Sequence, residues 1–145
     1  MILVDVNILV YAHRPDSENH NQYRKWLKEA LQAGSPCGLS ELVLAGLVRI
    51  VTNPRVFPDA TPIGIALKFA NQLREHPACV MVSPGGRHWE IFTGLCMKVG
   101  AKGNLVSDAY FAALAIELGA EWITTDRDYS RFPGLRWRHP LSQST

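Results

Sequence analysis

The stretch Ile2-Leu3-Val4-Asp5-Val6-Asn7-Ile8-Leu9-Val10 is apolar on both sides of one carboxylate and one amide. Such a run predicts a buried strand that leads into a helix, because a central parallel strand is apolar on both faces. Asp5 would then follow the strand, at the edge where open α/β sheets bind their ligands. Asp is also a favoured N-cap residue, so capping of the next helix explains Asp5 equally well from this stretch alone.

The length and the charge of the chain fit one globular domain. The 145 residues are 47% hydrophobic, which suffices for a single sizeable core, so we expect one domain over residues 1–145. The net charge of +2 is too mild to identify a polyanionic partner. The N-terminus lacks a basic leader, and Arg49 interrupts the longest apolar stretch, residues 42–51. We therefore expect neither a signal peptide nor a membrane span.

The three cysteines, Cys37, Cys79 and Cys96, are an odd number and lie far apart without a C-x-x-C pair. This pattern predicts reduced thiols in a cytoplasmic protein, and it argues against a disulfide framework or a zinc site. The five histidines show no ligand spacing, and we expect them at surface or turn positions. Gly85-Gly86-Arg87 lacks the spacing and the Lys-Ser/Thr of a P-loop, so a tight turn is the better interpretation.

Strand and helix patterns alternate along the whole chain. Ser40 predicts an N-cap, and Gly34, Gly100 and Gly119 predict helix ends. We expect the first strand before Asp5, a short link or strand at 35–39, and further strands at 79–82, 122–125 and 135–137. The expected helices cover 6–12, the segment from Asp16 or Ser17 to Gly34, 41–52, the segment from Thr61-Pro62 to His76-Pro77, 89–99 and 105–118. The alternation predicts an α/β/α sandwich with a mostly parallel central sheet.

This arrangement of strands and helices places four acidic residues at the same edge of the predicted sheet. Asp5 and Asp126 each follow an apolar strand, whereas Glu41 and Asp108 lie near the starts of helices that begin at the same sheet edge. The helix dipole alone can explain Glu41 and Asp108. If the strands before Asp5 and Asp126 are neighbours, however, four carboxylates converge, and their repulsion calls for a cation. Mg²⁺ or Mn²⁺ suits such oxygen ligands, and metal-dependent phosphodiester hydrolysis is the chemistry implied.

The sequence resembles the PIN-domain ribonucleases, and within them the VapC toxins of bacterial toxin-antitoxin pairs. The resemblance covers essentially the whole chain and is carried by four segments: Leu3-Val4-Asp5-Val6-Asn7, Ser40-Glu41-Leu42-Val43-Leu44, Asn104-Leu105-Val106-Ser107-Asp108-Ala109-Tyr110 and Thr124-Thr125-Asp126-Arg127-Asp128-Tyr129. It implies an acidic metal site made by Asp5, Glu41, Asp108 and Asp126, in which Asp5 and Asp108 are the metal ligands that the motif match identifies best.

The same resemblance implies supporting residues and partners. Asn7 and Thr124 match positions that orient the carboxylates or a water, although a helix-start amide and a β-branched strand residue explain them as well. Asp128 is a fifth acid or, more simply, a solvated loop charge, and Tyr129 stands where such proteins often have Phe. The implied partners are RNA, a second copy in a homodimer, and a VapB-type antitoxin that lays a helix and a tail over the cleft.

The sequence offers candidate binding surfaces for these partners, and each of them has a second explanation. The apolar faces of the helices from Ser17 to Gly34 and from Glu41 to Thr52 suit an antitoxin helix, yet core packing explains them equally well. Basic side chains near the cleft would hold RNA, and each could also be an ordinary surface residue. The candidates are Arg14, Arg49, Arg55, Arg127, Arg131, Arg136 and Arg138.

Two other functions compete with the nuclease. The first is a PIN-type module that binds RNA or protein without cutting, which the presence of all four acids disfavours. The second is a phosphoaspartyl protein, a receiver domain or a haloacid-type phosphatase, with Asp5 as the nucleophile. Asn at position 7 and the lack of a clear late Lys at a strand end argue against it.

Overall fold

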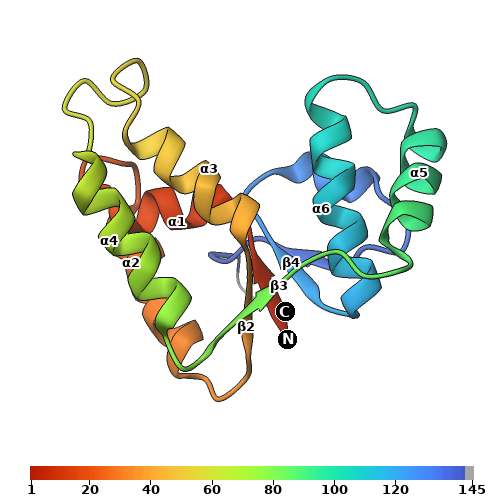
Figure 1. Cartoon of the computed structure of the whole chain (residues 1–145), viewed down its shortest axis with the longest axis horizontal. Helices are drawn as coiled ribbons and strands as arrows, with labels where there is room; N and C mark the ends of the chain where they lie inside the picture. The colour runs from red at the N-terminus through yellow and green to blue at the C-terminus, as the bar shows by residue number, and fades with distance from the viewer. Residues whose placement is uncertain (143–145) are drawn as a thin grey trace.

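The computed structural model describes residues 1–142 and contains a five-stranded sheet with helices on both sides (Figure 1). In chain order the elements are β1 (Ile2–Val4), α1 (Val6–His13), α2 (His20–Gln32), β2 (Cys37–Ser40), α3 (Glu41–Val51), α4 (Ile63–Glu75), β3 (Cys79–Val82), α5 (His88–Val99), α6 (Asn104–Leu118), β4 (Glu121–Ile123), the 3-10 turn η1 (Arg127–Arg131) and β5 (Trp137–Arg138). The predicted α/β class is confirmed.

The strand order explains where a ligand can approach. The sheet runs β3-β2-β1-β4-β5, and every neighbouring pair is parallel. The chain therefore winds outward from β1 in one direction through β3, and then continues on the other side of β1 with β4. In such sheets, ligands bind at the carboxyl ends of the strands where the order reverses. Asp5 and Asp126 follow the two strands on either side of this point.

The helices form two groups beside the sheet. Figure 1 shows α1 to α4 gathered on one side and α5 and α6 on the other, with the strands between them. Close packing between α1 and α3 is possible because Gly46 faces Val6: a Cβ at Gly46 would lie 3.4 Å from the Val6 side chain. At Gly38 in β2, an added Cβ would collide with the side chain of Leu3 in β1. These glycines let the central elements approach closely.

Local signals set the ends of several elements. The Ser40 hydroxyl accepts a hydrogen bond from the backbone N–H of Leu42 (3.1 Å), as expected of an N-cap. The start of α2 differs from the prediction, because Asn19 precedes the helix in a left-handed conformation (φ 59°). Ser17 instead donates to the carbonyl oxygens of Tyr11 and Arg14, so its hydroxyl serves the preceding turn. The final strand also begins later, at Trp137.

The hydrophobic core lies on both faces of the sheet and includes the aromatic side chains of β4 and η1. Trp122 and Tyr129 are each 1% exposed and are the two largest fully buried side chains in the described residues. The Trp122 ring stacks on Phe111, with ring centroids 5.5 Å apart, and lies 5.4 Å from the Tyr129 ring. This aromatic packing fixes η1, which carries Tyr129, against β4 and α6. No helix in residues 1–142 is long and apolar enough to cross a membrane.

Candidate metal and nucleic-acid site

Asp5 serves both as a helix cap and as a buried carboxylate. Its Oδ1 accepts a hydrogen bond from the backbone N–H of Val6 (2.7 Å), and its Oδ2 accepts one from the Thr124 hydroxyl (2.7 Å). Asp5 is only 6% exposed, and this burial raises the pKa of its carboxyl, an effect that the two hydrogen bonds oppose and the nearby charge of Asp126 reinforces. The two explanations of Asp5 are therefore compatible.

Thr124 connects the two strands at the point where the strand order reverses. It is fully buried, and besides donating to Asp5, its hydroxyl accepts a hydrogen bond from the backbone N–H of Asp126 (3.0 Å). The backbone N–H of Asp5 in turn donates to the Ile123 carbonyl (2.9 Å). One hydroxyl thus sets the position of the Asp5 carboxylate relative to the backbone of Asp126.

Asp108 completes a group of three interacting acids. It lies half-buried in the second turn of α6, and burial, followed by the charge of Asp126, raises its pKa to about 6. The charges of Asp5 and Asp128 also raise this pKa, whereas a hydrogen bond donated by the Tyr129 hydroxyl to Asp108 Oδ1 (3.3 Å) lowers it. Asp5, Asp108 and Asp126 therefore lie within one another's electric field.

Asp126 and Asp128 differ in their surroundings. Asp126 caps η1, because its Oδ1 accepts a hydrogen bond from the backbone N–H of Asp128 (2.9 Å). Asp128 itself is exposed, as expected of a solvated charge. Its negative charge nevertheless contributes to the raised pKa of Asp108. Asn7 lies half-buried in the first turn of α1, two positions after Asp5.

Glu41 is the predicted site residue that stands apart. It is the exposed first residue of α3 and lines a groove of about 420 Å³ between α3 and α4, together with Leu67 and Arg74. The pKa values of Asp5 and Asp108 both respond to Asp126, but neither responds to Glu41. The structure therefore shows electrostatic coupling among three of the four acids, and it places Glu41 on the wall of the α3–α4 groove.

The carboxylate oxygens of Asp5, Asp108 and Asp126 are suitable ligands for a divalent cation, although the three side chains do not converge on one point. Within residues 1–142, no three His, Cys, Asp or Glu side chains converge closely enough to coordinate one ion. Both Asp5 oxygens are engaged in hydrogen bonds. Yet none of the salt bridges in this part of the chain involves Asp5, Asp108 or Asp126. Partly desolvated carboxylates that repel one another without a basic partner are the donor set that a hard cation such as Mg²⁺ neutralises.

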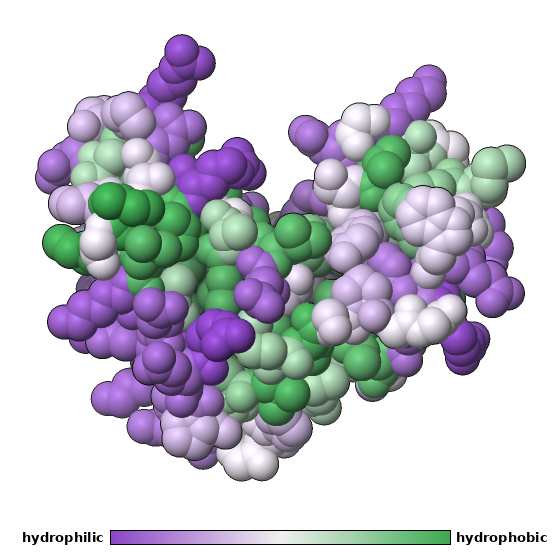
Figure 2. Space-filling model, in the orientation of Figure 1, coloured by the Kyte–Doolittle hydropathy of each residue, from purple (hydrophilic) through white to green (hydrophobic). Residues whose placement is uncertain are grey.

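A largely apolar groove of about 600 Å³ adjoins the acids. Val6, Leu42 and Ser107 line it and are the sequence neighbours of Asp5, Glu41 and Asp108. Figure 2 shows this face hollowed between the two groups of helices, with hydrophobic surface within the hollow and hydrophilic side chains toward its rims. The other lining residues are Val43, Ala45, Gly46, Arg49, Phe92, Val106, Tyr110 and Phe111.

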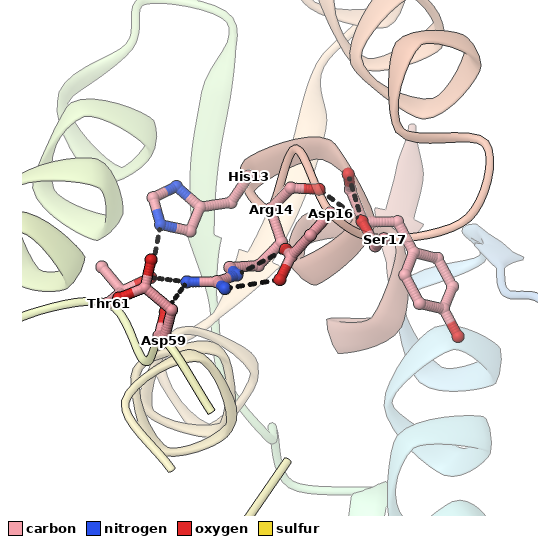
Figure 3. Close-up of polar contacts among 7 residues, drawn as sticks. His13, Arg14, Asp16, Ser17, Asp59 and Thr61 are labelled. Carbon is pink, nitrogen blue, oxygen red and sulfur yellow. Dashed lines mark hydrogen bonds and ion pairs between the residues drawn. The ribbon is translucent and has the colours of Figure 1, made fainter. Parts of the chain in front are cut away.

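Arg14, one of the predicted RNA-contacting residues, is buried, and its guanidinium forms hydrogen bonds within the protein. Its Nε and Nη2 donate to the Asp16 carboxylate (2.9 and 2.7 Å), and its Nη1 donates to the Asp59 carbonyl (2.7 Å) and the Thr61 hydroxyl (3.2 Å), as Figure 3 shows. The guanidinium also lies 4.4 Å from the centroid of the Phe57 ring. At 8% exposure, Arg14 ties the α3–α4 connection to the end of α1 and is not available to RNA.

The other basic candidates separate into two sets. Arg136 donates to the Gly119 carbonyl (2.6 Å), and Arg138 forms an ion pair with Glu121 (3.2 Å). Arg49 is exposed and lines the groove beside the acids, so it is the arginine best placed to meet a phosphate there. The remaining candidates, Arg55, Arg127 and Arg131, are also exposed.

Comparison with known proteins gives a consistent result. The family model of the PIN domain matches residues 2–135. A VapC ribonuclease of Mycobacterium bovis is 46% identical over 145 residues, which cover 100% of this chain and 99% of that protein. Ribonuclease VapC25 of Mycobacterium tuberculosis is 36% identical over 140 residues, covering 97% and 99%.

Two solved structures share the fold. The VapBC2 structure from Rickettsia felis, bound to a DNA fragment from their promoter, matches with a TM-score of 0.72 at 19% identity and covers 95% of this chain and 98% of that chain. The VapBC-1 structure from nontypeable Haemophilus influenzae gives a TM-score of 0.70 at 18% identity, covering 98% and 100%.

Proposed function

This chain belongs to the PIN-domain family, and we propose that it is an endoribonuclease that hydrolyses RNA phosphodiester bonds with Mg²⁺ or Mn²⁺, as the toxin of a VapBC-type pair. The observation that carries the proposal is the group formed by Asp5, Asp108 and Asp126 where the strand order reverses, beside a groove and without a basic partner. Its full-length relatives bear the name ribonuclease.

We assign each residue of the site a role from its position in the structure. Asp5 and Asp108 would hold the metal, with Asp126 as a further carboxylate from the same edge of the sheet. Glu41, which lines the α3–α4 groove, would join them by turning its exposed side chain toward β1. A bound divalent ion would lower the pKa of an attacking water and offset charge that develops on the phosphodiester. Thr124 would keep the Asp5 carboxylate in place through its 2.7 Å hydrogen bond, and Asn7 would orient a carboxylate or a water from the first turn of α1.

Substrate and partners follow from the surface beside the acids. Arg49, on the wall of the groove, would contact an RNA phosphate, and binding should weaken as salt rises because phosphate contacts release counterions. We further propose that the protein acts in the cytoplasm as a homodimer and is held inactive by a VapB-type antitoxin. Two solved structures that share its fold are VapBC assemblies, which supports such a partner.

The test is cleavage of total cellular RNA by the purified, antitoxin-free chain at low salt, with Mn²⁺, with Mg²⁺ or with EDTA. We expect discrete fragments that require metal and disappear in Asp108→Asn, while Glu29→Gln, which changes an exposed acid of α2, cleaves normally. Circular dichroism verifies that both variants are folded. RNA that is bound but left intact in the presence of metal would contradict the nuclease and identify a binding module.

A further inference from the structure

Tyr129 contributes a buried hydroxyl to the acid group. It is 1% exposed, its ring packs against Trp122 (5.4 Å between centroids) and Phe132 (5.9 Å), and its hydroxyl donates to Asp108 Oδ1 at 3.3 Å. A phenol hydroxyl is protonated at neutral pH and is therefore a donor. The buried ring and its two aromatic neighbours give the donor a fixed position.

We propose that Tyr129 is a positioning residue that holds the Asp108 carboxylate in its metal-binding orientation. Asp108 reaches the site from α6. Tyr129 reaches it from η1, the 3-10 turn that begins directly after Asp126. A donor on η1 therefore couples the orientation of Asp108 to the segment that carries Asp126. The inference rests on the proposed function, because it assigns Tyr129 a role toward the metal of that site.

Simple core packing is the competing explanation, and the hydroxyl distinguishes the two. Phe would preserve the ring contacts with Trp122 and Phe132 and would remove only the donor. The 3.3 Å separation is longer than the usual distance for a bond between two oxygens, as is common before a site is loaded. If packing were the whole role, Tyr129→Phe would leave metal affinity unchanged.

The experiment measures Mn²⁺ binding to the full chain through the EPR signal of the free ion. We expect Tyr129→Phe to weaken Mn²⁺ binding by about tenfold, the lower end of the effect of removing a group that orients a metal ligand. In an Asp108→Asn background the same change should have no further effect. The matched control is Tyr11→Phe, which removes the hydroxyl of a half-buried tyrosine on α1 outside the acid group.

Three results would count against these assignments in different ways. Equal Mn²⁺ affinity of the wild type and Tyr129→Phe would overturn the positioning role and leave the proposed function intact. An additional loss in the Asp108→Asn background would also overturn it, because the effect would then not pass through Asp108. If the folded wild type binds no Mn²⁺, both the metal-dependent function and the role of Tyr129 are refuted.

A second, independent feature is the cysteine pair at the opposite edge of the sheet. Cys37 and Cys79 are the first residues of β2 and β3, and they are direct partners in the parallel register. Adjacent strands lie about 4.8 Å apart. That spacing falls within the Cα separations that disulfides bridge. Paired residues share a face of the sheet, so the two thiols are neighbours. Their interaction lowers the pKa of Cys79 and, together with burial, raises that of Cys37.

We infer that Cys37 and Cys79 form a reversible cross-strand disulfide when the protein meets a disulfide oxidant such as oxidised glutathione. The Cys79 thiolate, which is half-buried, would attack the oxidant and release one glutathione thiol. The Cys37 thiol, which burial keeps protonated at rest, would then lose its proton as its sulfur attacks the Cys79 sulfur, and the second glutathione would leave as the thiol. The two cysteines are thereby oxidised and one glutathione disulfide is reduced. The new bond would join β2 to the edge strand β3 and enclose α3 and α4.

Intact mass spectrometry of the full chain after incubation with oxidised glutathione tests this inference. We expect the wild type and the control Cys96→Ser to lose two hydrogens without retaining glutathione. Cys37→Ser should instead retain a glutathione adduct on Cys79, because the resolving thiol is missing. A persistent adduct on Cys79 in the wild type, or a disulfide that includes Cys96, would overturn the assignment.

Discussion

Replacing Thr124 by Val tests how much the buried hydroxyl contributes to the assembly of the acid site. The substitution preserves the branched shape but removes the donor to Asp5 Oδ2 (2.7 Å) and the acceptor for the Asp126 N–H (3.0 Å). Because Thr124 is fully buried, water cannot replace either interaction without rearrangement. We therefore expect a loss of stability that exceeds the effect of the change in side-chain volume.

The expected magnitude follows from these two hydrogen bonds. A hydrogen bond to an ionised group contributes about 2 kcal/mol, and an amide left without a partner costs about 1 kcal/mol, which gives about 3 kcal/mol in total. For a chain of this size, that corresponds to a decrease in Tm of roughly 9 °C. The control Thr124→Ser retains the hydroxyl and loses one methyl group, for which we expect about 1 kcal/mol.

The assay is urea unfolding followed by circular dichroism, in EDTA at about pH 8, so that no metal contributes and the pH lies well above the ordinary carboxyl range. The m-value should be the same in all three proteins, so that the change in midpoint reports stability alone. The reasoning is refuted if Thr124→Val is no less stable than Thr124→Ser, since the hydroxyl would then contribute nothing beyond its methyl neighbour.

Three further predictions concern charge, close packing and the Arg14 network. The pKa of Asp108 is raised to about 6, so folding favours its protonated form. In EDTA, wild-type Tm should therefore rise relative to that of Asp108→Asn as pH falls through 6 toward the ordinary carboxyl value of about 4, and Asp108→Asn should be the more stable protein above pH 6 and lose this advantage across that window. Gly38→Ala should destabilise by about 2 kcal/mol in thermal unfolding, because its Cβ would collide with Leu3, while Gly94→Ala in α5, with nothing within 4 Å, should stabilise by roughly 0.5–1 kcal/mol. Arg14→Lys should lower Tm by several degrees, because Lys lacks the planar fork of donors, and an unchanged Tm would contradict the clamp described for this residue.

The sequence predicted the fold well because its signals are local. Strand-helix alternation and the Ser40 cap depend on residues near one another in the chain, and both are confirmed. The adjacency of the strands before Asp5 and Asp126 was a condition of the site hypothesis, and the register of β1 with β4 satisfies it. The assignment of site residues itself stays a prediction.

Features set by contacts distant in the sequence were not predictable. Arg14 resembles any surface arginine until the α3–α4 connection folds back and supplies the Asp59 carbonyl and Thr61. His88, expected at the surface or in a turn, is 3% exposed and bonds the Tyr110 carbonyl (2.9 Å) from the neighbouring helix. Tyr129 differs from the Phe that is frequent at this position only by its hydroxyl, and the partner of that hydroxyl, Asp108, lies 21 positions away in the sequence.

The hydrogen bond between Thr124 and Asp5 joins residues 119 positions apart, and this separation has a consequence for the time at which activity first appears. During translation, Asp5 leaves the ribosome early, but its partner strand β4 follows only after α6 has been synthesised. A nascent chain therefore carries an incomplete acid group until β4 and Asp126 have been synthesised. This order of assembly would delay nuclease activity until that point, and so would shield the messenger and the ribosome that produce the protein.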